Sequence, residues 1–158
     1  MKQQIVTKEA FRIVGMKERV RMDNPESVAK IPVMWGDAIQ NGLIGNLKKM
    51  NDIEPKGVLG VCVWADQNEF DYYVAVASDQ PASGNQCEFV IPGGMWAIFE
   101  SAGVQPEAIQ AVQNHAFFEW LPSSAHAYDR GTDVEFYPEG DQQSPDYRAE
   151  VWMPVRNK

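Results

Sequence analysis

The chain has 158 residues, 44% of them apolar and 11% aromatic, which suits one domain with a hydrophobic core and excludes a disordered protein. Its 14 basic and 22 acidic residues give a net charge of −8, which repels nucleic-acid phosphates and anionic lipid heads, so we expect no direct nucleic-acid partner. No segment has the apolar run of a signal peptide or a membrane span, so we expect a soluble, cytoplasmic protein without membrane contact.

The first half of the chain predicts a strand at residues 11–20, then a helix and a hairpin. The helix is expected because Asn24 is a capping residue and Pro25 suits a first helical turn. We expect Pro32 to distort or shorten this helix. Its apolar residues at helical spacing are Val28, Ile31, Trp35, Ala38 and Ile39. The hairpin strands are residues 57–65 and 70–78.

The second half of the chain repeats this order. Short strands are predicted at residues 87–91 and 95–100, and a helix runs from residue 105 to the breaker Pro122. A hairpin of residues 132–137 and 149–155 closes the chain.

The two predicted helices open alike, with Pro25-Glu26-Ser27-Val28 in one and Pro106-Glu107-Ala108-Ile109 in the other. This similarity indicates a weak internal duplication within a single domain, 1–158, with repeats at about residues 9–80 and 86–156. One strand-helix-hairpin unit exposes an apolar sheet face, so two units would pair around a pseudo-twofold axis to cover it. The predicted fold is therefore α+β and duplicated, with a ligand cleft at the junction of its halves.

Alternation along the closing hairpin sorts its side chains by face. Those expected to face the helices are Val134, Phe136, Val151 and Met153. That assignment leaves Glu135 and Tyr137 on the same face as Glu150 and Trp152. The predicted cleft is therefore acidic and aromatic, and carboxylates beside aromatic rings suit an organic cation.

Further aromatic candidates come from earlier segments. The expected core set of the first hairpin is Phe70, Tyr72, Val74 and Val76. Tyr73 would therefore point toward the cleft, and Trp64 lies on the face opposite Val61 and Val63. Trp35 sits on an apolar helix stripe, where core packing is favoured, but the irregularity at Pro32 keeps it as a candidate cleft wall. The pattern leaves the facing of Trp96 open.

Several motifs together, in order and spacing, resemble the GyrI-like (gyrase-inhibitor-like) effector-binding domain, which also forms the ligand-sensing part of some AraC-type and MerR-type transcription regulators. The resemblance covers the chain from about residue 11 to residue 155. The motifs are Pro92-Gly93-Gly94-Met95-Trp96-Ala97-Ile98-Phe99, Gly103, Glu119-Trp120-Leu121-Pro122, Val134-Glu135-Phe136-Tyr137 and Ala149-Glu150-Val151-Trp152-Met153-Pro154-Val155.

The resemblance implies a duplicated α+β domain with a curved antiparallel sheet, two main helices and a central cleft that receives amphipathic, often cationic, organic molecules. In this family acidic residues on the last two strands contact the ligand, and Glu135 and Glu150 match those positions. We therefore expect the protein to bind a lipophilic, cationic small molecule. The expected ligand-binding residues are Glu135, Glu150, Trp152, Tyr137, Tyr73, Trp64, Trp96 and Trp35.

Two other functions stay open. Some relatives hydrolyse strained electrophilic compounds with a glutamate and a tyrosine, which would make Glu150 or Glu135 the general base and Tyr73 or Tyr137 the general acid. No helix-turn-helix fits outside the matched region, so we expect a stand-alone effector-binding domain, and a role in transcription would need a regulator as partner. A protein-interaction module that pairs with such a regulator is the third reading. The sequence admits a monomer or a weak dimer.

Other chemistry finds no support in the sequence. Cys62 and Cys87 lack CxxC spacing and are expected to be reduced core thiols. His115 and His126 belong to no metal or catalytic motif, and Ser123 lacks the glycines of a nucleophile elbow. We therefore expect no cofactor, no metal and, on balance, no catalytic activity.

Overall fold

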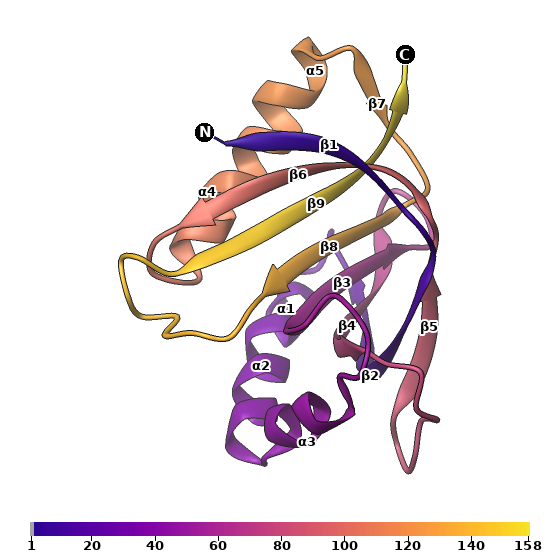
Figure 1. The fold of residues 1–158 in the computed structure, drawn as a ribbon, viewed down its shortest axis with the longest axis vertical. Coiled ribbons are helices and arrows are strands. Elements are labelled where there is room, and N and C mark those ends of the chain that lie inside the picture. The colour runs from indigo at the N-terminus through magenta and orange to yellow at the C-terminus, as the bar shows by residue number, and fades with distance from the viewer. Residues whose placement is uncertain (1) are drawn as a thin grey trace. The chain divides into compact units, whose positions relative to one another are not determined.

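A computed structural model describes residues 2–158 and shows an α+β fold with antiparallel strand pairs, as the sequence predicts (Figure 1). The chain divides into two compact units. Residues Phe11–Ile91 form one unit, called the middle unit here. The chain up to Ala10 together with Pro92–Lys158 forms the other, called the terminal unit. Each unit is a sheet with helices packed on one face, called its helix face.

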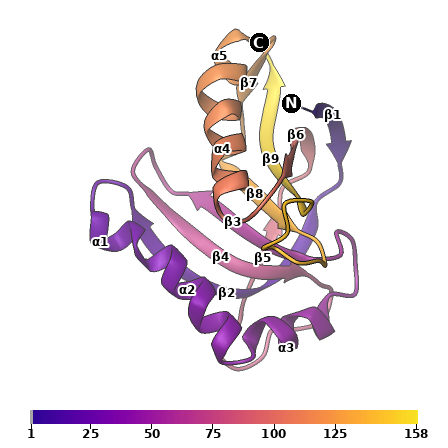
Figure 2. The ribbon, with the colours of Figure 1, turned by 90° about the vertical axis from the view of Figure 1, so that its left-hand side faces the viewer.

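The middle unit contains the strand, helical segment and hairpin predicted for the first half, plus one further strand. Its elements are β2 (Phe11–Arg21), α1 (Pro25–Val28), α2 (Lys30–Gln40), α3 (Leu43–Met50), β3 (Val58–Trp64), β4 (Glu69–Ala77) and β5 (Cys87–Ile91). The strands lie in the order β3-β4-β2-β5. The helices run along one face of this sheet (Figure 2), where the predicted core set Phe70, Tyr72, Val74 and Val76 is buried against them.

The single helix predicted after residue 24 is two helices in the structure, α1 and α2. Asn24 caps α1 as expected, since its side-chain oxygen accepts from the backbone N–H groups of Glu26 and Ser27. Pro32 explains the break after α1, because a proline ring clashes with the carbonyl four residues earlier, here that of Val28. Ile39, expected on the buried stripe, is 68% exposed. The sequence analysis did not predict α3 as a separate helix.

The terminal unit contains the second strand, helix and hairpin. Its elements are β1 (Gln3–Lys8), β6 (Gly94–Ala102), α4 (Glu107–His115), η1 (Ala116–Trp120), α5 (Leu121–Ser123), β7 (His126–Tyr128), β8 (Thr132–Tyr137) and β9 (Arg148–Asn157). Strands β1, β6, β9 and β8 are neighbours in that order, and β7 also pairs with β9. The predicted helix passes through a π-helical turn, η1, and Pro122 lies inside its last turn, α5, where it does not end the helix.

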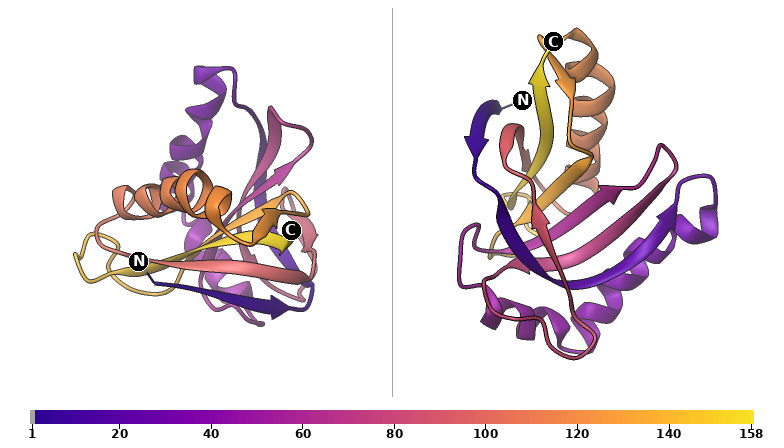
Figure 3. Two further views of the ribbon diagram at one scale, coloured as in Figure 1. Left: turned by 90° about the horizontal axis from the view of Figure 1, so that it is seen from above. Right: turned by 90° about the vertical axis from the view of Figure 1, so that its right-hand side faces the viewer.

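The helix formed by α4, η1 and α5 covers one face of β6 and β9, with β1 at the outer edge of the sheet (Figure 3). Buried residues from the strands and the helix meet in one core there. These are Ala97, Phe99, Ile109, Val112, Ala116, Tyr147, Ala149, Val151, Met153 and Val155. Strands β1 and β7 were not predicted from the sequence.

The two units are built alike, but each takes its outermost strand from outside its own strand-helix-hairpin segment. Strand β1 precedes β2 in the chain yet pairs with β6, and β5 precedes β6 yet pairs with β2. The unit boundaries therefore fall in the links between β1 and β2 and between β5 and β6. This exchange is why the terminal unit is not one continuous segment.

Candidate functional site

The last strand, β9, has the facing that alternation predicts. Val151 and Met153 belong to the core of the terminal unit, on the helix face. Glu150 and Trp152 therefore point to the opposite face, where the Trp152 indole Nε1 donates to Glu150 Oε1 at 2.8 Å.

Strand β8 has the reverse of the predicted facing. Its register places Glu135 across from Val151 and Phe136 across from Glu150, and residues directly opposite each other share a face. Glu135 thus points to the helix face, where its Oε2 accepts from Gln113 Nε2 of α4 at 2.8 Å. The expectation that Glu135 and Tyr137 share a face with Glu150 and Trp152 is wrong. The two carboxylates lie on opposite faces of the sheet.

The reversal has a simple physical cause. Side chains alternate with a period of two, so moving the assumed inward set by one residue moves every side chain of the strand to the other face. Val134 and Phe136 are the more apolar pair and were taken to face the helices. They contact instead the aromatic residues of the opposite face, since the rings of Phe136 and Trp152 are 5.9 Å apart. Tyr137 packs against the helix-face core.

In the middle unit Tyr73 lies on the face opposite the core set, as alternation predicts, and Trp64 lies on the face opposite Val61, but this is the helix face and so not the face of Tyr73. Tyr73 points away from the helices, toward Phe89 at 5.7 Å between rings and Lys17 at 5.8 Å from its ring. Trp64 lies across from Phe70, with the two rings tilted by 47° and their centroids 4.6 Å apart, so it shares the helix face. Trp35 is also on that face, and its Nε1 donates to the Tyr72 hydroxyl at 3.0 Å.

The structure also settles the facing of Trp96. It points to the face opposite the helices, 1% exposed, and forms an edge contact with Trp152 at 5.9 Å. The Arg130 guanidinium lies over its ring at 5.0 Å. The candidate residues therefore divide equally between helix faces and opposite faces. The helix faces hold Glu135, Tyr137, Trp64 and Trp35, and the opposite faces hold Glu150, Trp152, Trp96 and Tyr73.

Exposure separates these two groups further. All the helix-face candidates are half-buried and so keep surface for a ligand. On the opposite faces, Trp152, Trp96 and Tyr73 are at most 3% exposed, and Glu150 alone is half-buried. Burial also raises the pKa of Tyr73, which makes its hydroxyl a weaker general acid than an exposed tyrosine.

Glu135 lies on the helix face of the terminal unit, the face that carries an aromatic and apolar core. The half-buried side chains that pack on the helix-face core include Tyr137 from the same strand and Phe117 and Trp120 from η1. The Trp120 ring stacks on His126 at 5.7 Å, and Phe117 lies 6.0 Å from the Tyr128 ring. Sequence analysis missed Gln113 and Phe117 because neither belongs to a recognisable motif.

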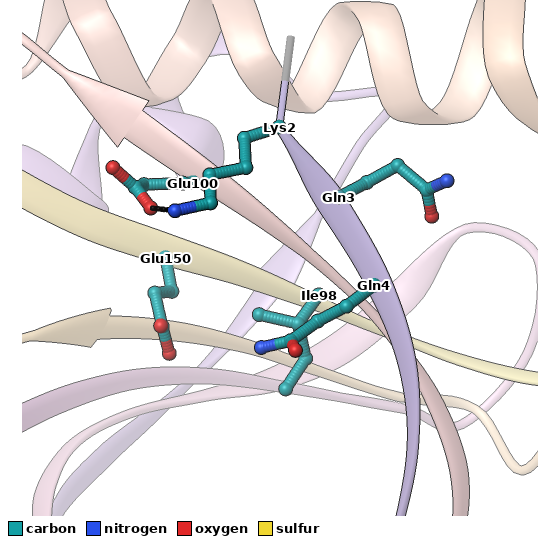
Figure 4. A pocket seen from close by; sticks show the side chains of 6 residues that line it. All are labelled: Lys2, Gln3, Gln4, Ile98, Glu100 and Glu150. Carbon is teal, nitrogen blue, oxygen red and sulfur yellow. Dashed lines mark ion pairs between the residues drawn. The ribbon is translucent and has the colours of Figure 1, made fainter.

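Glu150 lies in a different environment, a pocket of ≈ 250 Å³ on the face opposite the helices (Figure 4). Glu150 is directly across from Glu100, an arrangement that disfavours both charges. Lys2 at 3.8 Å and Arg148 at 2.5 Å from Glu100 offset that repulsion. The pocket lining is mostly polar, with Ile98 as its apolar member, and the remaining residues are Lys2, Gln3, Gln4, Glu100 and Glu150.

Metal and thiol chemistry can be judged from the side chains of residues 2–158. Among them, no group of three or more His, Cys, Asp or Glu side chains is arranged to hold a metal ion. His115 pairs with Glu119 at 2.7 Å on the helix surface. Cys62 and Cys87 are reduced cysteines, half-buried in strands. No helix in this part of the chain is long and apolar enough to cross a membrane.

Solved structures of similar proteins have the same fold. A proposed transcription regulation protein of Staphylococcus aureus MU50 is 24% identical, with 99% of each chain covered and a TM-score of 0.84. SAV2435, whose structure was determined bound to tetraphenylphosphonium, is 26% identical over 99% of this chain and 94% of its own, with a TM-score of 0.87. An integron cassette protein of Vibrio cholerae is 18% identical over 98% and 95%, with a TM-score of 0.70.

No curated protein sequence matched the chain. A family model does match it, the GyrI-like small molecule binding domain, over residues 1–156. The match takes in both units, including the outer strands β1 and β5 that each unit draws from elsewhere in the chain. The chain therefore belongs to the family of GyrI-like small molecule binding domains.

Proposed function

We propose that this small-molecule-binding domain takes lipophilic organic cations, and that Glu135 supplies the negative charge that holds them. The likeness to SAV2435 supports the ligand class, since that protein binds tetraphenylphosphonium and shares 26% of its residues with this chain. The net charge of −8 supports it too, because it attracts cations to the whole molecule.

The observation that carries the proposal is a half-buried carboxylate on the same sheet face as half-buried aromatic and apolar side chains. Glu135 has Tyr137 on the same strand and face, and Phe117 and Trp120 line the same helix-face core. A cation over a partly desolvated ring gains about 1–2 kcal/mol. Burying roughly 300 Å² of phenyl surface adds about 7 kcal/mol before ordering costs are subtracted. Together these terms allow a Kd in the micromolar range.

Glu150 offers a cation less. Its pocket is lined mainly by polar and charged groups, including Lys2, whose ammonium repels a cationic ligand. Without apolar surface a lipophilic cation gains little beyond screened charge attraction. Glu150 is therefore the matched control for Glu135, with the same charge, the same residue type and a neighbouring strand.

The test is calorimetric titration with tetraphenylphosphonium and with tetraphenylborate, an anion of nearly the same shape. We expect saturable binding of the cation and no binding of the anion. The affinity for the cation should be at least about tenfold weaker in Glu135→Gln, because that variant loses one well-placed charge pair. Glu150→Gln should change the Kd by less than about twofold, as a screened surface charge does. Equal affinity in wild type and Glu135→Gln would overturn the proposal.

A further inference from the structure

Gln113 is the residue of α4 that reaches the Glu135 carboxylate. Three neighbours on α4 and η1, Ile109, Val112 and Ala116, are buried in the core of the terminal unit, which fixes the backbone at Gln113. Its side chain is half-buried, and Nε2 lies 2.8 Å from Glu135 Oε2. That separation is in the range of a hydrogen bond to a charged acceptor.

We propose that Gln113 is a positioning and specificity-determining residue that orients the Glu135 carboxylate for a cationic ligand. This inference rests on the proposed function. The Gln113 amide donates to one oxygen of the carboxylate and adds no positive charge of its own. A carboxylate that accepts such a bond is held in one orientation, so a cation meets an acceptor that is already in place.

A basic residue at position 113 would act in the opposite way. A lysine or arginine there would place a tethered cation within reach of Glu135, and the ligand would have to compete with it. The neutral amide therefore matters for selectivity as well as for geometry. It holds the acid without taking the place of the cation that the site is built to receive.

The hydrogen bond also separates this role from ordinary packing. If Gln113 acts through Glu135, removing its amide costs cation affinity only while the carboxylate is present. If Gln113 merely supports α4, its replacement costs the same with or without that carboxylate. A double-mutant cycle between the two positions distinguishes the two cases.

The experiment titrates tetraphenylphosphonium and tetraphenylborate into full-length wild type, Gln113→Met, Gln113→Lys, Glu135→Gln and the Gln113→Met/Glu135→Gln pair. Gln110 is exposed on the same helix, so Gln110→Met and Gln110→Lys are matched controls. We expect Gln113→Met to weaken cation binding about fivefold, the scale of one hydrogen bond to a charged group. Gln113→Lys should weaken it further and improve binding of the anion, and Gln110 variants should match wild type.

The outcomes separate the two proposals. Glu135→Gln that binds the cation like wild type refutes the proposed function itself. A second outcome is that Glu135→Gln weakens binding while Gln113→Met and Gln113→Lys both stay within about twofold of wild type. That outcome refutes the role of Gln113 and leaves the proposed function standing. An equal loss from Gln113→Met in both backgrounds also refutes it, since the effect would then not pass through Glu135. Thermal melting of each variant shows whether it is folded. If Gln113→Met does not fold, the affinity of Gln113→Lys tests the role of Gln113 in its place.

Discussion

Arg130 is a largely buried side chain that joins two strands of the terminal unit. Its guanidinium donates to the backbone carbonyl of Met95 on β6 and, at 3.1 Å, to that of Val155 on β9. Met95 and Val155 are directly opposite each other, so the guanidinium bridges the two strands. It also lies over the Trp96 ring at 5.0 Å, and only 16% of its side chain is exposed.

The expected size of the effect follows from these contacts. Two hydrogen bonds from a charged donor contribute about 1.5–3 kcal/mol each, and the contact with Trp96 adds about 1–2 kcal/mol. Desolvation of the guanidinium and the lost freedom of a long side chain offset roughly 2–3 kcal/mol of that sum. We therefore expect Arg130→Met to lower the free energy of unfolding by about 3 kcal/mol, which is a large part of the ~5–15 kcal/mol typical of a protein.

Urea unfolding, followed by tryptophan fluorescence, measures this loss. Arg130→Lys should recover little of it, because one ammonium cannot reproduce the planar fork that serves two carbonyls. Arg156 is exposed on β9, and Arg156→Met, the matched control, should change stability by less than about 0.5 kcal/mol. Arg130→Met within about 1 kcal/mol of wild type would show that the bridge is not a major source of stability.

Two further predictions concern buried hydroxyls. Burial, and then the charge of Glu139, raises the pKa of Tyr147 to about 12, so the folded state holds this proton more tightly than the unfolded chain, whose tyrosine has a pKa near 10.0. The free energy of unfolding should therefore fall as pH rises from 10 toward 12, by about 1 kcal/mol at pH 11. Urea unfolding at pH 9 and pH 11 measures this fall. The contribution of Tyr147 should be missing in Tyr147→Phe. Tyr72→Phe removes the hydroxyl that accepts from Trp35 Nε1, and should cost about 1–2 kcal/mol in urea unfolding at neutral pH; no loss would mean that this hydrogen bond adds nothing net.

Local sequence signals predicted most of the elements. Asn24 and Pro25 marked the start of α1, and alternating apolar residues marked both hairpins, because caps, prolines and period-two patterns act within a few residues. Strand β1 escaped prediction for a related reason. Its residues are largely exposed, so pairing with β6, which is distant in sequence, defines it more than its own hydrophobic pattern does.

The facing of β8 could not be predicted by the same reasoning. In β9 one alternating set is apolar throughout, from Ala149 to Val155, whereas the other contains Arg148 and Glu150, so the pattern favours one solution. In β8 both alternating sets contain an aromatic ring, Phe136 in one and Tyr137 in the other, and the more apolar set does not face the helices. Tertiary packing on both faces of a sheet removes the contrast between inside and outside on which alternation depends.

The separation of Glu135 from Glu150 changes what a cationic ligand can recognise. Two acids on one face would have formed a single, doubly charged site that could bind small inorganic cations as well as organic ones. On opposite faces, each acid depends on its own surroundings, and these differ in apolar area. Glu135 shares its sheet face with half-buried rings, whereas Glu150 shares a polar pocket with Glu100 and Lys2. Because apolar burial contributes more than a screened charge to the binding of a lipophilic cation, the apolar surroundings of Glu135, and not its charge alone, should make it the preferred of the two acids.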